Sequence, residues 1–159
     1  MKPGAGMTPE RVREASKRFY EKLRENIERV GHSVISVFGD EQRPPFSYTV
    51  GLWEARLPEL ILVIGIEPQD ALNAVNAVAG LLRRRERAFD QWQELDIGFN
   101  VPVRMHNPYD IELVRQEWTM QAGQLLRVQD YPVQQILFPD ANGKWPDERG
   151  YQMKMQPLL

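Results

Sequence analysis

Three residues of the sequence have the chemistry of an acid–base group: Glu59, Arg104 and His106. A carboxylate, an imidazole and a guanidinium can together move a proton and hold an anion. The sequence does not place the three near one another, and charged side chains mostly stay exposed or paired. We therefore expect surface or ion-pair roles for these side chains, keep them as candidate binding residues, and predict no catalytic residue.

The second candidate site is a short strand whose two faces differ in size. Phe46 and Tyr48 share one face, whereas Thr49 and Gly51 belong to a face of small residues. That small face suits either a ligand or the close approach of a helix. We treat Pro45, Phe46, Tyr48, Thr49 and Gly51 as candidate binding residues. Packing against an alanine-rich helix is the more frequent outcome, because pockets are few per protein.

Two aromatic residues near the end of the sequence, Trp145 and Tyr151, could form a lid or anchor a partner. Exposed aromatic side chains are typical of protein interfaces. A tail tucked over the edge of the sheet explains them equally well, so both interpretations stay open.

Several kinds of chemistry are disfavoured by what the sequence lacks. The absence of cysteine excludes disulfides and thiolate metal sites. The two histidines do not have metal-binding spacing, and there is no nucleophile elbow, P-loop or dinucleotide fingerprint. The basic run Arg83–Arg87 is typical of a solvated helix end, because cations stabilise that end of the helix dipole. We predict no metal and no nucleic-acid partner.

The composition is that of one ordinary domain. The chain has 159 residues, 42% of them hydrophobic, and a formal net charge of −2. The most apolar run, Leu60–Ile66, is shorter than the roughly 20 residues that cross a bilayer. No apolar signal segment is visible at the start. We expect a cytoplasmic protein that does not bind membranes, with a flexible leader over 1–7 and a single domain over 8–159.

Hydrophobic periodicity predicts three helices and five strands. Thr8 and Gly31 are the cap and the stop of a helix over 8–30. Pro68 opens an alanine-rich second helix, and Asn107 caps a third that continues to Leu125. The predicted strands are 33–38, 46–52, 59–66, 101–106 at an edge, and 133–138, with a loop over 88–100. We predict an α+β fold: a single domain with a mixed, mostly antiparallel sheet of about five strands covered by three helices.

Over roughly residues 32–151 the sequence resembles a bacterial family of small uncharacterised domains. The residues that carry the resemblance are Gly39-Asp40, Pro44-Pro45-Phe46-x-Tyr48-Thr49-Val50-Gly51-Leu52, Pro58-Glu59-Leu60 and Phe138-Pro139-Asp140-x-x-Gly143-x-Trp145-Pro146. The family pattern is D-x-x-x-P-P-F-x-Y-T-[IV]-G-L followed by P-E-L and P-D-x-x-G-x-x-P-W. This chain has tryptophan before proline in the last element. The resemblance implies kinship and assigns no activity.

Two looser fold-level analogies suggest functions. The strand and helix order is similar to the suppressor-of-fused superfamily, which implies a non-enzymatic protein-binding module of the defence or toxin-immunity type, without a cofactor. We predict this function, with an unknown protein partner and a homodimer as one assembly. The order also resembles flavin-reductase-like split barrels. The alternative is therefore a flavin- or nucleotide-binding protein, with its site on the small face and with Arg104 and His106 nearby.

Overall fold

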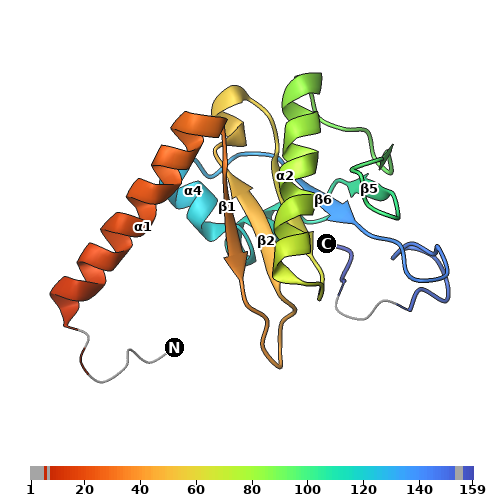
Figure 1. Cartoon of the computed structure of the whole chain (residues 1–159), viewed down its shortest axis with the longest axis horizontal. Helices are drawn as coiled ribbons and strands as arrows, with labels where there is room; N and C mark the ends of the chain where they lie inside the picture. The colour runs from red at the N-terminus through yellow and green to blue at the C-terminus, as the bar shows by residue number, and fades with distance from the viewer. Residues whose placement is uncertain (1–5, 7, 153–155) are drawn as a thin grey trace.

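The computed structural model describes residue 6, residues 8–152 and residues 156–159, and one six-stranded sheet runs through it (Figure 1). The order across the sheet is β1-β2-β3-β6-β5-β4. Strands β3 and β6 are parallel, and every other neighbouring pair is antiparallel. The strands are β1 (Ser33–Val37), β2 (Phe46–Val50), β3 (Glu59–Val63), β4 (Glu94–Leu95), β5 (Val103–His106) and β6 (Val133–Leu137).

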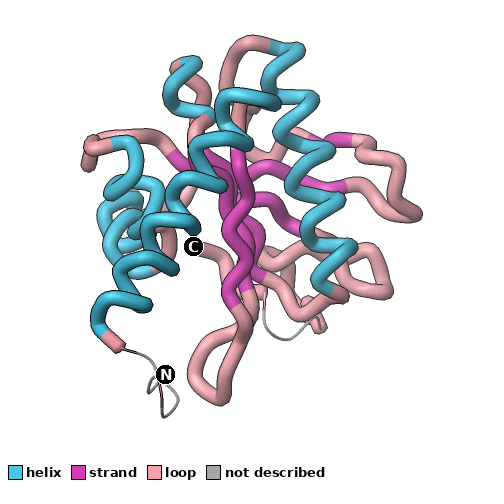
Figure 2. The backbone as a smooth tube through the Cα atoms, turned by 60° about the vertical axis from the view of Figure 1, so that its left-hand side comes forward, coloured by secondary structure: helices cyan, strands magenta, loops and turns pink. Residues whose placement is uncertain are grey.

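Helices cover both faces of the sheet (Figure 2). Helix α2 (Pro68–Arg85) packs on β1, β2 and β3 from one side. On the other side lie α1 (Pro9–Val30), α3 (Ile111–Glu117) and α4 (Met120–Leu126). A short 3₁₀ helix, η1 (Leu52–Ala55), connects β2 to β3. None of the described helices is long and apolar enough to cross a membrane.

Strand β3 is buried on both sides, as its continuous apolar run predicts. Leu60 and Leu62 belong to the core under α2, while Ile61 and Val63 belong to the core under α1, α3 and α4. Successive side chains of a strand point to opposite faces, so one strand contributes to two separate cores. Because β3 lies between β2 and β6, a residue at its end, such as Glu59, is close to the ends of both neighbouring strands.

Local capping chemistry fixes the bounds of α1. The Thr8 hydroxyl accepts a hydrogen bond from the amide of Arg11, and Pro9 occupies the first turn. At the other end Gly31 adopts a left-handed conformation with φ of 93°, and its amide donates to the carbonyl of Ile27. Both ends agree with the sequence prediction. Of the predicted leader over 1–7, all but Gly6 lies outside the described residues.

The prediction of a single α+β domain with a mixed sheet is confirmed, but some of its elements are wrong. The third helix is two helices, α3 and α4, which separate at Trp118 and Thr119. Its N-cap is Asp110, which accepts from the amide of Leu113, instead of Asn107. The hydroxyl of buried Thr119 lies 2.6 Å from the Tyr131 hydroxyl, and this long-range contact coincides with the break.

The number of strands is also higher than predicted. The segment over 88–100 contains β4, a two-residue strand that pairs with β5. Strand β5 therefore lies between β6 and β4 instead of at the edge. Pro102 immediately precedes β5, so it removes no hydrogen bond from the ladder.

Candidate functional site

Glu59 is the most heavily hydrogen-bonded of the candidate residues. Its side chain is fully buried at the start of β3. One oxygen, Oε1, accepts from the Thr49 hydroxyl at 2.8 Å and from the Leu52 amide at 3.1 Å. The other, Oε2, accepts from the amides of Gly51 and Trp53, each at 3.1 Å. The carboxylate thus satisfies the free N–H groups at the start of η1 and ties β2 to β3.

The protonation of Glu59 reflects two opposing effects. Burial raises the pKa of the Glu59 carboxyl to about 7, while its four hydrogen-bond donors favour the ionised form and oppose that rise. A carboxyl that titrates near neutrality could act in acid–base chemistry. Here its four lone-pair directions are all engaged by the chain itself. Glu59 therefore positions the β2–β3 connection.

Thr49 and Gly51, at the centre of the small face, are in direct contact with other residues of the chain. The Thr49 hydroxyl donates to Glu59 and also accepts from the amide of Leu60 at 2.8 Å. Gly51 has φ of 110°, and a Cβ built on it would lie 2.7 Å from Cγ1 of Ile27 on α1. The close approach at Gly51 is therefore made by a side chain of α1, and the expected packing of this residue against the alanine-rich helix α2 is wrong.

The large face of β2 is part of the core. Phe46 meets Trp118 edge-on, with ring centroids 5.0 Å apart. Tyr48 is fully buried and donates a hydrogen bond to the side-chain oxygen of Gln121 on α4. Burial raises the pKa of Tyr48, so its hydroxyl stays protonated. Pro45, just before the strand, is half-buried. These contacts hold α3 and α4 against the sheet.

Arg104 is near another candidate residue, but not near Glu59. Its guanidinium makes an ion pair with Glu94, at an N–O distance of 3.0 Å, and lies 4.3 Å from the ring centroid of Trp145. Trp145 is buried. Tyr151 donates a 3.4 Å hydrogen bond to a main-chain oxygen nearby. Strand β6 separates β3 from β5, so Glu59 does not join this group.

His106 is buried and holds the end of the described chain. Its Nε2 lies 2.8 Å from the main-chain oxygen of Leu159, and its Nδ1 lies 2.7 Å from the side-chain amide nitrogen of Gln91. The neutral tautomer with hydrogen on Nε2 satisfies both contacts. The ring stacks on Trp92 and meets Tyr109 edge-on. Burial lowers the pKa of His106, which favours the neutral form.

Buried glutamines, which the sequence analysis did not single out, attach residues 156–159 to the sheet. Gln135 on β6 donates to the carbonyl of Pro157 at 2.7 Å and accepts from the amide of Leu159 at 3.0 Å. In return, Gln156 accepts from the amide of Phe138 at 2.9 Å and donates to its carbonyl at 2.8 Å. The sequence does contain a signal for these contacts, because Gln134 and Gln135 interrupt an otherwise apolar strand.

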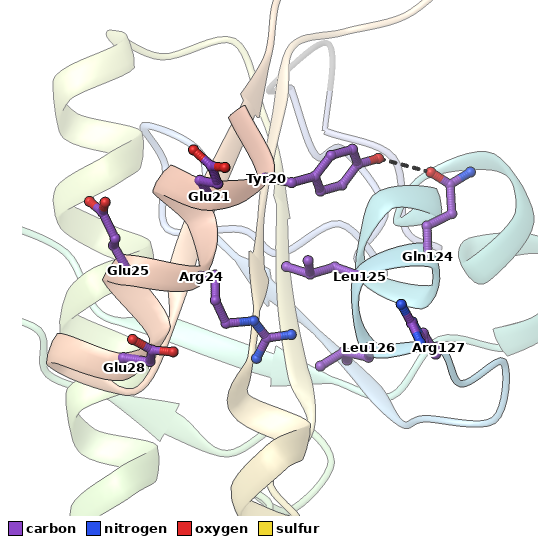
Figure 3. A pocket seen from close by; sticks show the side chains of 9 residues that line it. All are labelled: Tyr20, Glu21, Arg24, Glu25, Glu28, Gln124, Leu125, Leu126 and Arg127. Atoms are coloured by element: carbon purple, nitrogen blue, oxygen red, sulfur yellow. Dashed lines mark hydrogen bonds between the residues drawn. The ribbon is translucent and has the colours of Figure 1, made fainter. Parts of the chain in front are cut away.

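A groove with a volume of about 820 Å³ lies between α1 and α4 (Figure 3). Tyr20 and Arg24 reach from α1 toward α4, and Leu125 and Leu126 reach back from α4. The Tyr20 hydroxyl donates to the side-chain oxygen of Gln124 at 3.2 Å and bridges the two helices. The residues that line the groove are Tyr20, Glu21, Arg24, Glu25, Glu28, Gln124, Leu125, Leu126 and Arg127.

The charge of this groove is slightly acidic. Glu21, Glu25 and Glu28 contribute three carboxylates, against the guanidiniums of Arg24 and Arg127. Arg24 is also neutralised outside the groove, because it makes an ion pair with Glu54. An apolar floor beside an acidic α1 wall suits a partner with apolar and basic side chains. The residues of this groove were not among those predicted from the sequence.

Within the described part of the chain, no group of three or more His, Asp or Glu side chains could hold a metal ion. The oxygen-rich side chains that lie together, such as Glu59 and Thr49, hydrogen-bond to the chain itself.

The fold and the sites define a single-domain α+β protein built on a mixed sheet. Residues 26–152 match a family described as a domain of unknown function (DUF4262), and the chain belongs to that family. The resemblance to a family of uncharacterised domains is confirmed. Comparison with curated proteins gives no significant match, and neither does comparison with solved structures.

Proposed function

We propose that this protein is a protein-binding module whose contact surface is the outer half of α1 together with the α1–α4 groove. The observation that carries the proposal is the exposure of the apolar stripe of α1. Only Leu23 and Ile27 of this helix are buried, whereas Val12 is 42% exposed and Phe19 is 44% exposed. A stripe that is apolar but uncovered is typical of a contact surface.

The length of α1 explains why the stripe is uncovered. A helix of 22 residues is about 33 Å long at 1.5 Å per residue, whereas the five-residue strand beside it spans about 17 Å. The N-terminal half of α1 therefore extends beyond the sheet (Figure 1). The apolar residues of this half, Val12 and Phe19, therefore have no part of the sheet beneath them.

Charge complementarity points to the kind of partner. The groove has an acidic wall, so we propose that it accepts an amphipathic helix with basic flanks. The outer half of α1 has this chemistry, because Arg11, Arg13, Lys17 and Arg18 outnumber Glu10 and Glu14 there. A second copy of this chain, packed with its α1 antiparallel to the first, is the partner that we propose. A defence or toxin-immunity setting, in which such modules bind proteins, remains part of this proposal and has its support in the suppressor-of-fused resemblance.

Sedimentation velocity over a range of protein concentrations tests the proposal. We expect a reversible dimer, which Phe19→Asp weakens by at least about tenfold, because an aromatic residue at the centre of an interface contributes about 2 kcal/mol or more. The matched control is Phe38→Asp, since Phe38 is 89% exposed and lies on the loop after β1. Equal weakening by both variants would contradict the assignment of this surface.

If the wild-type protein is monomeric, a photoreactive residue at position 19, with position 38 as its control, identifies a different partner in cells. Crosslinking specific to position 19, mapped to a basic amphipathic helix of another protein, supports protein binding but refutes the dimer. Equal crosslinking from both positions refutes the protein-binding surface altogether.

A further inference from the structure

A second hollow, separate from the α1–α4 groove, lies where the end of α1 meets β1 and α2. It has a volume of about 540 Å³. Its lining contains two arginines, two asparagines and a histidine, but no aspartate or glutamate. The residues are Asn26, Arg29, Val30, His32, Ser33, Val34, Leu72, Asn76 and Arg83.

The two arginines of this hollow have no carboxylate partner among the described residues. Arg29 donates to the side-chain oxygen of Asn26 at 3.3 Å. Arg83, on α2, crosses above Gly31, where its Nη1 would lie 2.7 Å from a Cβ built on that glycine. A guanidinium makes its strongest hydrogen bonds with carboxylate or phosphate oxygens. Two positive charges beside one hollow, without a negative charge in its lining, favour an anionic ligand.

The C-terminal end of α1 repels an anion in this hollow, whereas the two arginines attract one, so the sizes of the charges must be compared. The C-terminus of a helix has a negative partial charge of about half an elementary charge. The guanidiniums of Arg29 and Arg83 each carry a full positive charge. The summed charge at the hollow is therefore positive.

His32 provides an independent observation. It is 5% exposed, and its Nε2 makes a 2.8 Å hydrogen bond with Oδ1 of Asn76. Its Nδ1 is buried and has no hydrogen-bond partner among the described residues. Buried polar atoms are nearly always paired, so an unpaired nitrogen on a residue that lines a hollow is a candidate for a ligand contact. Burial and the charge of Arg83 lower the pKa of His32, so the ring is neutral in the free protein. An anion beside Nδ1 would favour the imidazolium, with Nε2–H donating to Asn76 and Nδ1–H donating to the anion.

We propose that this hollow binds the phosphate group of a small anionic ligand, with Arg29 and Arg83 pairing with its oxygens and His32 Nδ1 donating a hydrogen bond. A guanidinium matches phosphate geometry because its N–H donors form a planar fork. Val30, Val34 and Leu72 form an apolar wall beside the charged residues. This wall suits the organic part of a phosphate ester, whereas free phosphate needs the polar residues alone.

Isothermal titration calorimetry with inorganic phosphate and with phenyl phosphate tests the proposal on the full chain. We expect both to bind, and tighter binding of phenyl phosphate identifies an ester site, while equal affinities identify a site for free phosphate. Arg83→Gln is expected to weaken binding by about tenfold or more, because a hydrogen bond to a charged group contributes about 1.5–3 kcal/mol. Arg84→Gln is the matched control, since Arg84 is the next residue of α2, is exposed and does not line the hollow.

Proton NMR gives a readout that folding changes do not mimic, because the chain has two histidines. Phosphate is expected to shift the ring signals of His32 and to leave those of His106 in place. No heat of binding for either probe would overturn the proposal. Equal loss in Arg83→Gln and Arg84→Gln would also overturn it, because that result is general charge attraction. Shifts of both histidines would place the anion elsewhere and overturn it as well.

Discussion

Replacing Gly51 by alanine should destabilise the protein strongly, for two separable reasons. The first is the backbone: φ of 110° is a conformation that residues with a Cβ adopt at a cost of about 1–3 kcal/mol. The second is space, because the new Cβ would lie 2.7 Å from Cγ1 of Ile27, and forcing an extra methyl into a packed core costs about 1–3 kcal/mol. We expect a total loss of about 2–6 kcal/mol, out of a typical stability of about 5–15 kcal/mol.

A double-mutant cycle with Ile27→Ala separates the two causes. In the Ile27→Ala background the steric part should vanish, so Gly51→Ala should cost about 1–3 kcal/mol less than it does in the wild type. Urea unfolding followed by tryptophan fluorescence measures the four free energies, with sucrose added equally to all samples if the double variant is too unstable.

The matched control is Gly80→Ala. Gly80 lies inside α2, where a Cβ would come no closer than 3.5 Å to Arg84. This change should stabilise the protein slightly, because alanine favours a helix by up to about 1 kcal/mol over glycine. A neutral Gly51→Ala, or a cost that Ile27→Ala does not reduce, would refute the account of the α1–η1 contact.

Two further predictions concern buried polar groups. The pKa of Glu59 is about 7 in the folded protein, above its ordinary value of 4.5, so between these two pH values the folded state keeps a proton that the unfolded chain has lost. The contribution of Glu59 to the unfolding free energy therefore falls as the pH rises from 4.5 to about 7, by up to about 3 kcal/mol. The difference between wild type and Glu59→Gln, from urea unfolding at several pH values, isolates this contribution, and a difference independent of pH would contradict the raised pKa. Gln156→Ala removes both hydrogen bonds to the main chain of Phe138, so we expect the free energy of unfolding to fall by about 1–3 kcal/mol. Hydrogen exchange of the Phe138 amide should also become faster, and unchanged exchange would show that Gln156 does not protect this amide.

The parts of the fold that could be predicted are those that neighbouring residues determine. Thr8 and Gly31 cap α1 through hydrogen bonds within the first and last turns, so their chemistry is visible in the sequence. The two-sided burial of β3 follows from its uninterrupted apolar run. The break between α3 and α4 coincides with a contact between Thr119 and Tyr131, which is a tertiary contact that helical periodicity does not record.

The candidate site shows the same division. Thr49, Gly51 and Glu59 are close in the sequence, and the structure does bring them together. Their contacts are with one another and with Ile27, which the pattern could not show, because it places small residues on one face but does not record what fills the space beside them. The hydrogen bonds of Gln135 connect β6 to residues 157 and 159, which are far away in the sequence. The groove is likewise formed by two helices, α1 and α4, that are far apart in the chain. Sequence spacing does not contain that information.

Helix α1 shows most clearly what periodicity can and cannot establish. Its stripe of Val12, Phe19, Leu23 and Ile27 identifies the apolar face correctly, but the same pattern describes buried and exposed parts of the helix alike. What covers a face depends on the lengths of the elements: the helix is about 33 Å long and the strand beside it is about half of that. The apolar residues beyond the sheet cannot be explained by the core of one chain. We propose that these residues contact another protein surface, and a second α1 has both the apolar stripe and the basic charge for that contact.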